Sequence, residues 1–175
     1  MLFRFGVSAG HMSKTLDVGF RGQGFWAFDV VSGIFLKHLI DAAEPRIADQ
    51  HEPCLAEAVG HWRFNAICAD CGLFLDENWS AEQVQSVREL ATSACALLSM
   101  RREISAEEKS SWSLLDGKGV FPRGYASIMT ESAIQLGRAI IQLLDVSLPE
   151  APRGTWWFFG TEDGPPILAK RQETT

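Results

Sequence analysis

The sequence predicts an α+β domain that is mainly α-helical, with about five helices packed with a small antiparallel sheet or hairpin from the two chain ends. Five segments carry apolar residues at three- and four-residue spacing, the N-terminal end alternates apolar and polar residues, and the C-terminal end has a β-prone run. The 175 residues are 46% hydrophobic and 22% charged, which is typical of a globular protein. No stretch is suited to link two domains, so residues 1–175 are expected to form a single globular domain. Residues 1–12 could be a dispensable extension, because Met12 could be the start.

The predicted strands lie near the ends. Residues 15–20 alternate clearly and residues 2–5 less cleanly, whereas residues 155–159 and 167–170 flank a turn at 161–164 and predict a hairpin. The run Trp156-Trp157-Phe158-Phe159 cannot point to one side of a strand, since neighbouring side chains alternate between its faces. Either both faces are covered or one face is an interaction surface, and the sequence leaves this choice open.

The first two predicted helices are read from their apolar spacing and their proline and glycine signals. The first spans residues 26–44 and is expected to end at Pro45. The second runs from Pro53, a favourable first-turn residue, to about Cys71, with Gly72 as its stop. Its inward residues are expected to be Leu55, Val59, Trp62 and Ala66.

The other three predicted helices have clear start signals or clear periodicity. Ser80-Ala-Glu-Gln83 is a capping box that opens a helix with an apolar stripe from Val84 to Leu98. Ser105-Ala-Glu-Glu108 repeats this signal, and the helix is expected to continue to Leu115 before the glycine-containing loop at 116–119. The last helix begins at Thr130, and Pro149 and Pro152 follow its end.

The negative charge is concentrated in one segment. The net charge is −6, yet residues 41–89 alone hold ten acidic and three basic residues, a net charge of −7. Such a field repels nucleic acid and anionic lipid and attracts basic partners. The adjacent basic pairs, Arg101-Arg102 and Lys170-Arg171, are too few for a nucleic-acid footprint.

The cysteines and the apolar runs indicate a cytoplasmic protein. The four cysteines lack the dense, regular spacing of a secreted disulfide scaffold, so we expect them to be reduced. The N-terminus has no apolar run of signal-peptide length, and the longest uncharged apolar run, residues 30–36, is too short to cross a bilayer. We therefore expect neither export by that route nor a membrane span.

Two residue sets have the ligand types of a metal site. Cys68 and Cys71 form a C-x-x-C pair, with Cys54 and His61 upstream, but structural zinc sites normally place such pairs on tight turns rather than in a helix. The alternative is that the cysteines are small buried hydrophobic residues. The second set lies one helical turn apart on two helices and would suit a small metal-dependent hydrolase. It comprises His38, Asp41, Glu57 and His61.

Other catalytic patterns are weak, and no cofactor is predicted. Gly6-Val-Ser8-Ala-Gly10 fits the G-x-S-x-G pattern of a nucleophile elbow, but too little chain precedes it for the required strand. Gly19, Gly22 and Gly24 are in the wrong order for a dinucleotide-binding loop, and no P-loop pattern occurs.

The segment 24–28, Gly-Phe-Trp-Ala-Phe, and the ending Pro152-Arg-Gly-Thr-Trp-Trp-Phe-Phe-Gly-Thr-Glu-Asp-Gly164 resemble those of small bacterial proteins. Some of these are similar to immunity proteins of polymorphic and contact-dependent toxin systems. The resemblance covers length, acidity and the absence of a catalytic motif, and it supplies no site residues. It implies a cytoplasmic, non-enzymatic protein that binds one cognate toxin domain and occludes its active site or substrate path.

An acidic segment would associate quickly with the basic cleft of a toxin that cleaves nucleic acid. Trp62, Trp79 and Trp112 are candidate anchors for such a partner. The predicted loop between the second and third helices is the expected binding region. The predicted partner-binding residues are Asp70, Asp76, Glu77, Trp79 and Glu82. The alternatives are the metal-dependent hydrolase and a structural or scaffold subunit.

Overall fold

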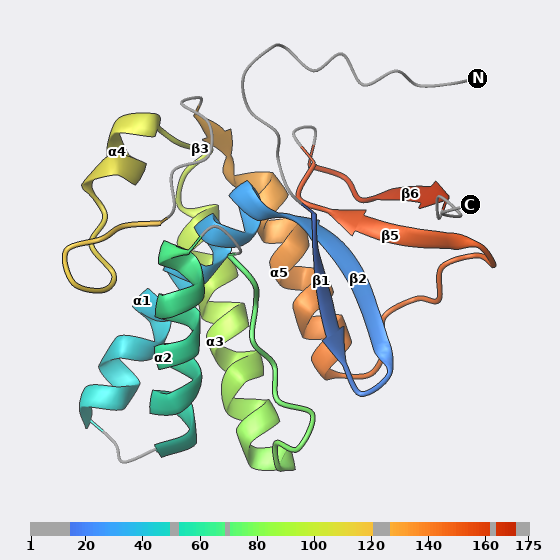
Figure 1. Cartoon of the computed structure of the whole chain (residues 1–175), viewed down its shortest axis with the longest axis horizontal. Helices are drawn as coiled ribbons and strands as arrows, with labels where there is room; N and C mark the ends of the chain where they lie inside the picture. The colour runs from blue at the N-terminus through green and yellow to red at the C-terminus, as the bar shows by residue number, and fades with distance from the viewer. Residues whose placement is uncertain (1–14, 50–52, 69–70, 121–126, 162–163, 171–175) are drawn as a thin grey trace.

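The computed structural model describes residues 15–49, 53–68, 71–120, 127–161 and 164–170. This part of the chain contains five helices and two small sheets and is mainly α-helical (Figure 1). The helices are α1 (Asp29–Asp49), α2 (Pro53–Ile67), α3 (Ala81–Ser99), α4 (Ala106–Ser111) and α5 (Thr130–Leu144). The strands are β1 (Thr15–Phe20), β2 (Gln23–Phe28), β3 (Glu103–Ile104), β4 (Ile128–Met129), β5 (Thr155–Phe159) and β6 (Ile167–Lys170). The predicted fold class is confirmed.

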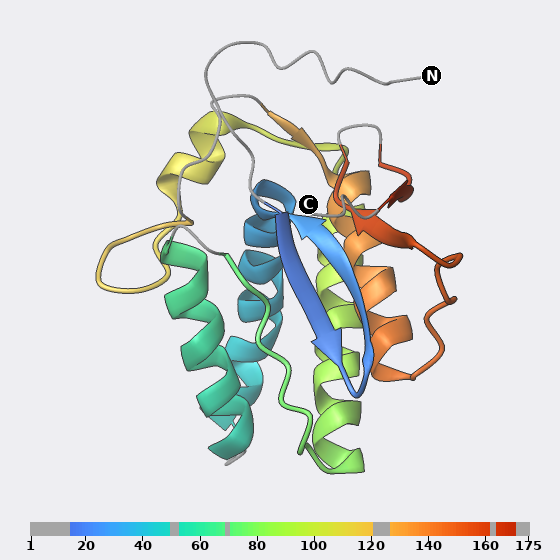
Figure 2. The ribbon, with the colours of Figure 1, turned by 45° about the vertical axis from the view of Figure 1, so that its right-hand side comes forward.

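The core lies between four helices and one face of the larger sheet. α1 packs against α2, α3 and α5, and α3 packs along α5. The hairpin β1–β2 lies against α5 and also contacts α1, as Figure 2 shows. Its alternate apolar residues therefore point toward the helices. Wholly buried large side chains from these elements include Phe20, Phe25, Phe35, Trp62 and Leu98.

The two ends of the described chain meet in the four-stranded sheet, whose order is β1-β2-β5-β6. β5 and β6 form the predicted antiparallel hairpin, and β1 and β2 form a second antiparallel pair, whereas β2 and β5 pair in parallel. The aromatic run in β5 alternates between the faces. Phe159 is buried and packs edge-on against Phe25 at 4.8 Å, while Phe158 stacks on Trp26 on the other face with ring centroids 6.4 Å apart. Both rings of this second pair are half-buried.

The predicted boundaries of the first helix are wrong at both ends. Residues 26–28 belong to β2, because Arg21 and Gly22 take positive φ angles of 47° and 79° and turn the chain back along β1. At the other end, α1 continues through Pro45 to Asp49. A proline inside a helix costs about 3 kcal/mol, but here Arg46 holds the last turns by bonding Glu89 and Ser86 of α3.

Helices α3 and α5 agree closely with the prediction, and the capping box of Ser80 and Gln83 is formed. α2 ends at Ile67, earlier than predicted. α4 begins after Ser105 as predicted but ends at Ser111, because Trp112 leaves the helix and packs against α1. Its ring centroid lies 5.9 Å from that of His38 and 5.4 Å from the ammonium nitrogen of Lys37.

Two further predictions concern membranes and the N-terminal segment. Among the described residues, no helix has the length and apolar character required to cross a membrane. The possible strand at residues 2–5 and the G-x-S-x-G pattern from Gly6 to Gly10 lie outside the described residues.

Candidate functional site

The acidic loop, defined as residues 71–80, runs along the helices from the end of α2 to the start of α3 (Figure 2). It has no regular secondary structure, yet side chains from α1, α2 and the β1–β2 turn donate hydrogen bonds to its carbonyl oxygens. The donor and acceptor pairs are Ser32 Oγ to Cys71 (2.7 Å), Asn65 Nδ2 to Gly72 (2.7 Å), Trp62 Nε1 to Phe74 (2.8 Å), Arg21 Nε to Glu77 (3.3 Å) and Arg21 Nη2 to Trp79 (2.6 Å). These bonds satisfy backbone groups that lack a helix or sheet partner and hold the loop in one conformation.

The loop also stabilises its own last residues. Oδ1 of Asp76 accepts hydrogen bonds from the backbone N–H of Asn78 at 2.9 Å and from its side-chain amide at 3.1 Å. Ser80 then accepts from the backbone N–H of Gln83 at 3.2 Å, and the Gln83 side chain accepts from the N–H of Ser80 at 2.7 Å. An Asx turn and a capping box thus fix the path into α3.

The predicted partner-binding residues differ in how far their side chains are exposed. Glu77 is exposed in the loop and Glu82 is exposed in the first turn of α3, and neither carboxylate pairs with a base among the described residues. Asp76 is half-buried and holds the turn. Trp79 is only 6% exposed and belongs to the core in this conformation, so its predicted role as an anchor for a partner stays a prediction. Asp70 lies outside the described residues.

The other two candidate anchors differ in exposure. Trp62 is wholly buried, and Trp112 is half-buried against α1. Several acids of the 41–89 segment form ion pairs away from the acidic loop. These pairs are Asp41 with Lys37, Glu44 with Arg63 and Glu89 with Arg46. Among the described residues of 41–89, Glu77 and Glu82 are therefore acidic residues that form no ion pair.

The candidate metal ligands are not brought together. Across the described ranges, no group of three or more His, Cys, Asp or Glu side chains is placed to hold a metal ion. His38 is buried on α1, whereas His61 is exposed on α2 and stacks on Phe74 at 4.4 Å, and Glu57 is exposed. Cys71 is buried, and its thiol lies near the carbonyl oxygens of Ala66 and Cys68. Neither predicted metal site is assembled.

His38 instead joins α1 to the segment that follows α3. Its Nδ1 lies 2.9 Å from the carbonyl oxygen of Ile34, and its Nε2 lies 3.2 Å from Nη2 of Arg101. A carbonyl only accepts and a guanidinium only donates, so the geometry assigns the proton to Nδ1 and a neutral ring. Burial lowers the pKa of His38, and the positive charges of Arg101 and Lys37 lower it further, against the raising effects of the Ile34 bond and Asp41.

A pH-dependent loss of stability follows from this neutral, buried ring. Because the pKa of His38 is lowered in the folded state, the unfolded chain takes up the proton first as the pH falls below the ordinary histidine value near 6.5. The contribution of the neutral His38 ring to the free energy of unfolding is present above that pH. It is lost as the pH falls toward the pKa of the folded state, by at most about 1.4 kcal/mol per pH unit. Urea unfolding at about pH 7.5 and 5.5 should show a smaller pH dependence for His38→Gln than for wild type. The exposed His61→Gln serves as control, and an unchanged pH dependence in His38→Gln would contradict this assignment.

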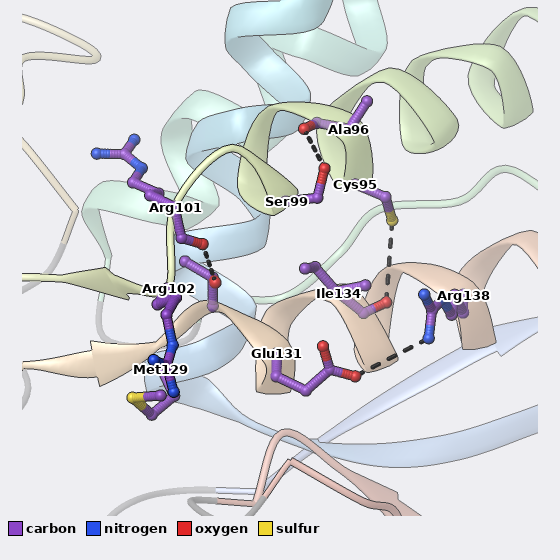
Figure 3. Close-up of a pocket in the computed structure, with 10 residues that line it drawn as sticks. Cys95, Ala96, Ser99, Arg101, Arg102, Met129, Glu131, Ile134 and Arg138 are labelled. Carbon is purple, nitrogen blue, oxygen red and sulfur yellow. Dashed lines mark hydrogen bonds and ion pairs between the residues drawn. The ribbon is translucent and has the colours of Figure 1, made fainter.

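A second candidate site, the arginine pocket, lies between the end of α3 and the start of α5 (Figure 3). Its volume is about 540 Å³. Its lining residues are Cys95, Ala96, Ser99, Arg101, Arg102, Met129, Thr130, Glu131, Ile134 and Arg138. The sequence did not predict this pocket, because its two walls are about thirty residues apart and meet only when α3 packs along α5.

The side chains of the pocket carry an excess of positive charge. The Arg101 guanidinium points away from the pocket toward Glu108 and His38 (Figure 3). Arg102 has no ion-pair partner among the described residues. Arg138 lies 3.9 Å from Glu131, but both side chains are more than half exposed, so this pair is weak. The pocket thus presents two available guanidinium groups and one carboxylate.

The last residues of the acidic loop and the arginine pocket lie at opposite ends of α3, whose 19 residues form a helix about 28 Å long. No protein-family model, curated protein or solved structure gives a significant match to the chain.

Proposed function

We propose that this chain is a non-enzymatic binding protein that captures a basic protein partner on the acidic loop and the first turn of α3. The observation that carries the proposal is the combination of a loop held by four side chains from other elements with two exposed, unpaired carboxylates. The Arg21 guanidinium donates hydrogen bonds to the backbone carbonyl oxygens of residues 77 and 79, near the end of the loop. The Glu77 and Glu82 side chains remain directed to solvent.

Preorganisation makes this loop suited to binding. An irregular segment that is ordered only on binding reduces affinity by its lost conformational freedom. Here the hydrogen bonds from Ser32, Trp62 and Asn65 already order the loop in the free protein. A partner that contacts its carboxylates would therefore meet a surface close to its bound shape, and binding residues are commonly carried on such supported loops.

Charge indicates the chemistry of the partner. Residues 41–89 have a net charge of −7, which accelerates encounter with a positively charged surface. A toxin that cleaves nucleic acid has a basic cleft for phosphates, and carboxylates placed over that cleft would compete with its substrate. Together with the resemblance to immunity proteins, this supports a cytoplasmic protein that neutralises a cognate bacterial toxin by occluding its toxin domain.

Affinity capture of the full chain from its native cells tests the proposed function. The capture should be carried out at low and at moderate salt, because screening weakens contacts between exposed charges. We expect one stoichiometric basic protein that is toxic when expressed alone and harmless with this chain. A partner without toxicity would indicate a scaffold subunit and contradict the immunity role. Deletion without self-intoxication or sensitivity to sibling cells would also contradict it.

Charge reversal tests the acidic loop directly. The double variant Glu77→Lys/Glu82→Lys should lower the rate of association with the captured partner about tenfold or more at low salt, since it opposes electrostatic steering. The matched control Glu103→Lys/Glu107→Lys makes the same change in net charge with exposed residues near the other end of α3. Stopped-flow or surface-based kinetics over a salt series would measure both. Equal effects of the two variants would show that net charge alone matters and would reject the acidic loop as the binding site.

A further inference from the structure

The outer face of the four-stranded sheet, which is the face directed away from the helices, carries a group of aromatic side chains. We propose that it is a second contact surface for the basic partner, in which an arginine side chain of the partner lies on the Trp26 ring and pairs with Asp17. The inference rests on the proposed function and deepens it, because exposed carboxylates speed the encounter whereas tight binding needs apolar anchors.

The pairing of the strands places these rings on one face. Trp26 of β2 is the register partner of Phe158 of β5, and Phe28 lies two residues further along β2, with its ring centroid 6.3 Å from that of Phe158. Trp156 lies two residues before Phe158 and therefore points to the same side. All four rings are half-buried, and none of them belongs to the hydrophobic core of the described residues. These four residues are called the aromatic face below.

The aromatic face is not covered by any helix of the described chain, since α1 and α5 contact the sheet from its other side (Figure 2). A sheet with one face in water normally directs polar side chains outward. Here the outward positions are aromatic, and Ile167 of β6, the register partner of Phe158, is 36% exposed beside them. An uncovered apolar patch of this kind is typical of a protein–protein contact.

Charge indicates the chemistry of the group that this face binds. Asp17 of β1 is the register partner of Trp26, and its side chain is exposed on the same face. Among the described residues it forms no ion pair, and it is the one charged residue that the four strands direct outward. A carboxylate beside a tryptophan ring suits an arginine, because a guanidinium stacks on the ring and pairs with the carboxylate.

The acidic loop adjoins this face along the edge strand β1 (Figure 2). Arg21, in the turn between β1 and β2, donates to the carbonyl oxygens of Glu77 and Trp79 and so ties the loop to the sheet. One basic partner would therefore meet aromatic rings at the centre and carboxylates at the rim. This is the usual arrangement of a protein–protein interface.

Titration of the full chain with the peptide Arg-Gly-Arg-Gly-Arg, followed by amide and indole NMR shifts, tests the aromatic face without the partner. We expect saturable shifts of the indole N–H groups of Trp26 and Trp156. Asp17→Asn should weaken binding several-fold, whereas Asp116→Asn, an exposed residue outside this surface, makes the same change in charge and should have no effect. Shifts confined to the acidic loop, or indifference to Asp17→Asn, would overturn the proposal.

Binding kinetics with the captured partner separate this inference from the proposed function. Trp26→Thr keeps a strand-forming residue but removes the ring, so it should speed dissociation about tenfold and change association little. Asp17→Asn, a change of similar shape at an exposed position, should also speed dissociation and keeps the test valid if Trp26→Thr lowers stability. Phe64→Ala removes an exposed ring on α2 and should change neither rate.

The possible failures are distinguishable. If Glu77→Lys/Glu82→Lys slows association while Trp26→Thr and Asp17→Asn dissociate like wild type, the aromatic face is rejected and the proposed function stands. If no partner is captured, the proposed function fails, and the peptide titration decides on the aromatic face.

Discussion

Trp62→Ala should lower the free energy of unfolding by about 3–5 kcal/mol, the cost of removing a large aromatic side chain from a core. Trp62 is wholly buried on α2, and its indole N–H donates to the carbonyl oxygen of Phe74 at 2.8 Å. The variant leaves a cavity and also leaves that carbonyl without its donor, so both the core and the acidic loop lose support. Urea unfolding with linear extrapolation measures the change.

Two controls on the same helix divide this effect into its parts. Trp62→Phe keeps most of the apolar volume but loses the N–H donor, so it should cost about 1–3 kcal/mol. Phe64→Ala removes an aromatic ring that is 58% exposed and should change stability by no more than about 0.5 kcal/mol. A loss in Trp62→Ala no larger than that in Phe64→Ala would contradict the packing described for α2. If the acidic loop binds the partner, Trp62→Phe should also slow partner association.

Gly137→Ala should destabilise the protein by about 1–3 kcal/mol, although alanine is the better helix former. A Cβ atom at residue 137 would lie 2.5 Å from Cε2 of Phe35 and closer still to the sulfur of Cys95. Phe35 is 1% exposed and has no room to move away. The glycine is therefore required where α5 meets α1 and α3, because only a residue without a side chain permits this close approach.

Gly60→Ala is the matched control, since it makes the same change in the interior of another helix. Nothing lies within 4 Å of a Cβ atom at residue 60, and the residue is exposed. This variant should raise stability by about 0.5–1 kcal/mol through helix propensity alone. Chemical unfolding of both variants should therefore give changes of opposite sign. Stabilisation by Gly137→Ala would show that the three helices pack less closely than described.

Local signals in the sequence predicted the elements that depend on local interactions. The capping box at Ser80 placed the start of α3 correctly, because its two hydrogen bonds join residues three positions apart. The alternation in residues 15–20 placed β1 for a similar reason, since one face of the strand is directed to the core, and the β-prone aromatic residues of 155–159 placed β5. Each of these patterns depends only on residues that are close together in the sequence.

Errors arose where distant contacts outweighed a local signal. Pro45 signalled the end of α1, but the bonds of Arg46 to α3 hold the helix beyond it. The apolar residues from 26 to 28 fit the spacing of the following helix, yet pairing with β1 makes them a strand.

The sequence by itself determined the fold class, the capped helices and the acidic character of residues 41–89, since these depend on composition and on residues close in the chain. The tertiary structure alone decided which carboxylates stay exposed, because Arg21, Trp62 and Asn65 reach the acidic loop from elsewhere. It also decided that His38 and His61 have separate surroundings and that Arg102 and Arg138 share a pocket. Each of these depends on the distances between elements, which the periodicity of a single chain does not specify.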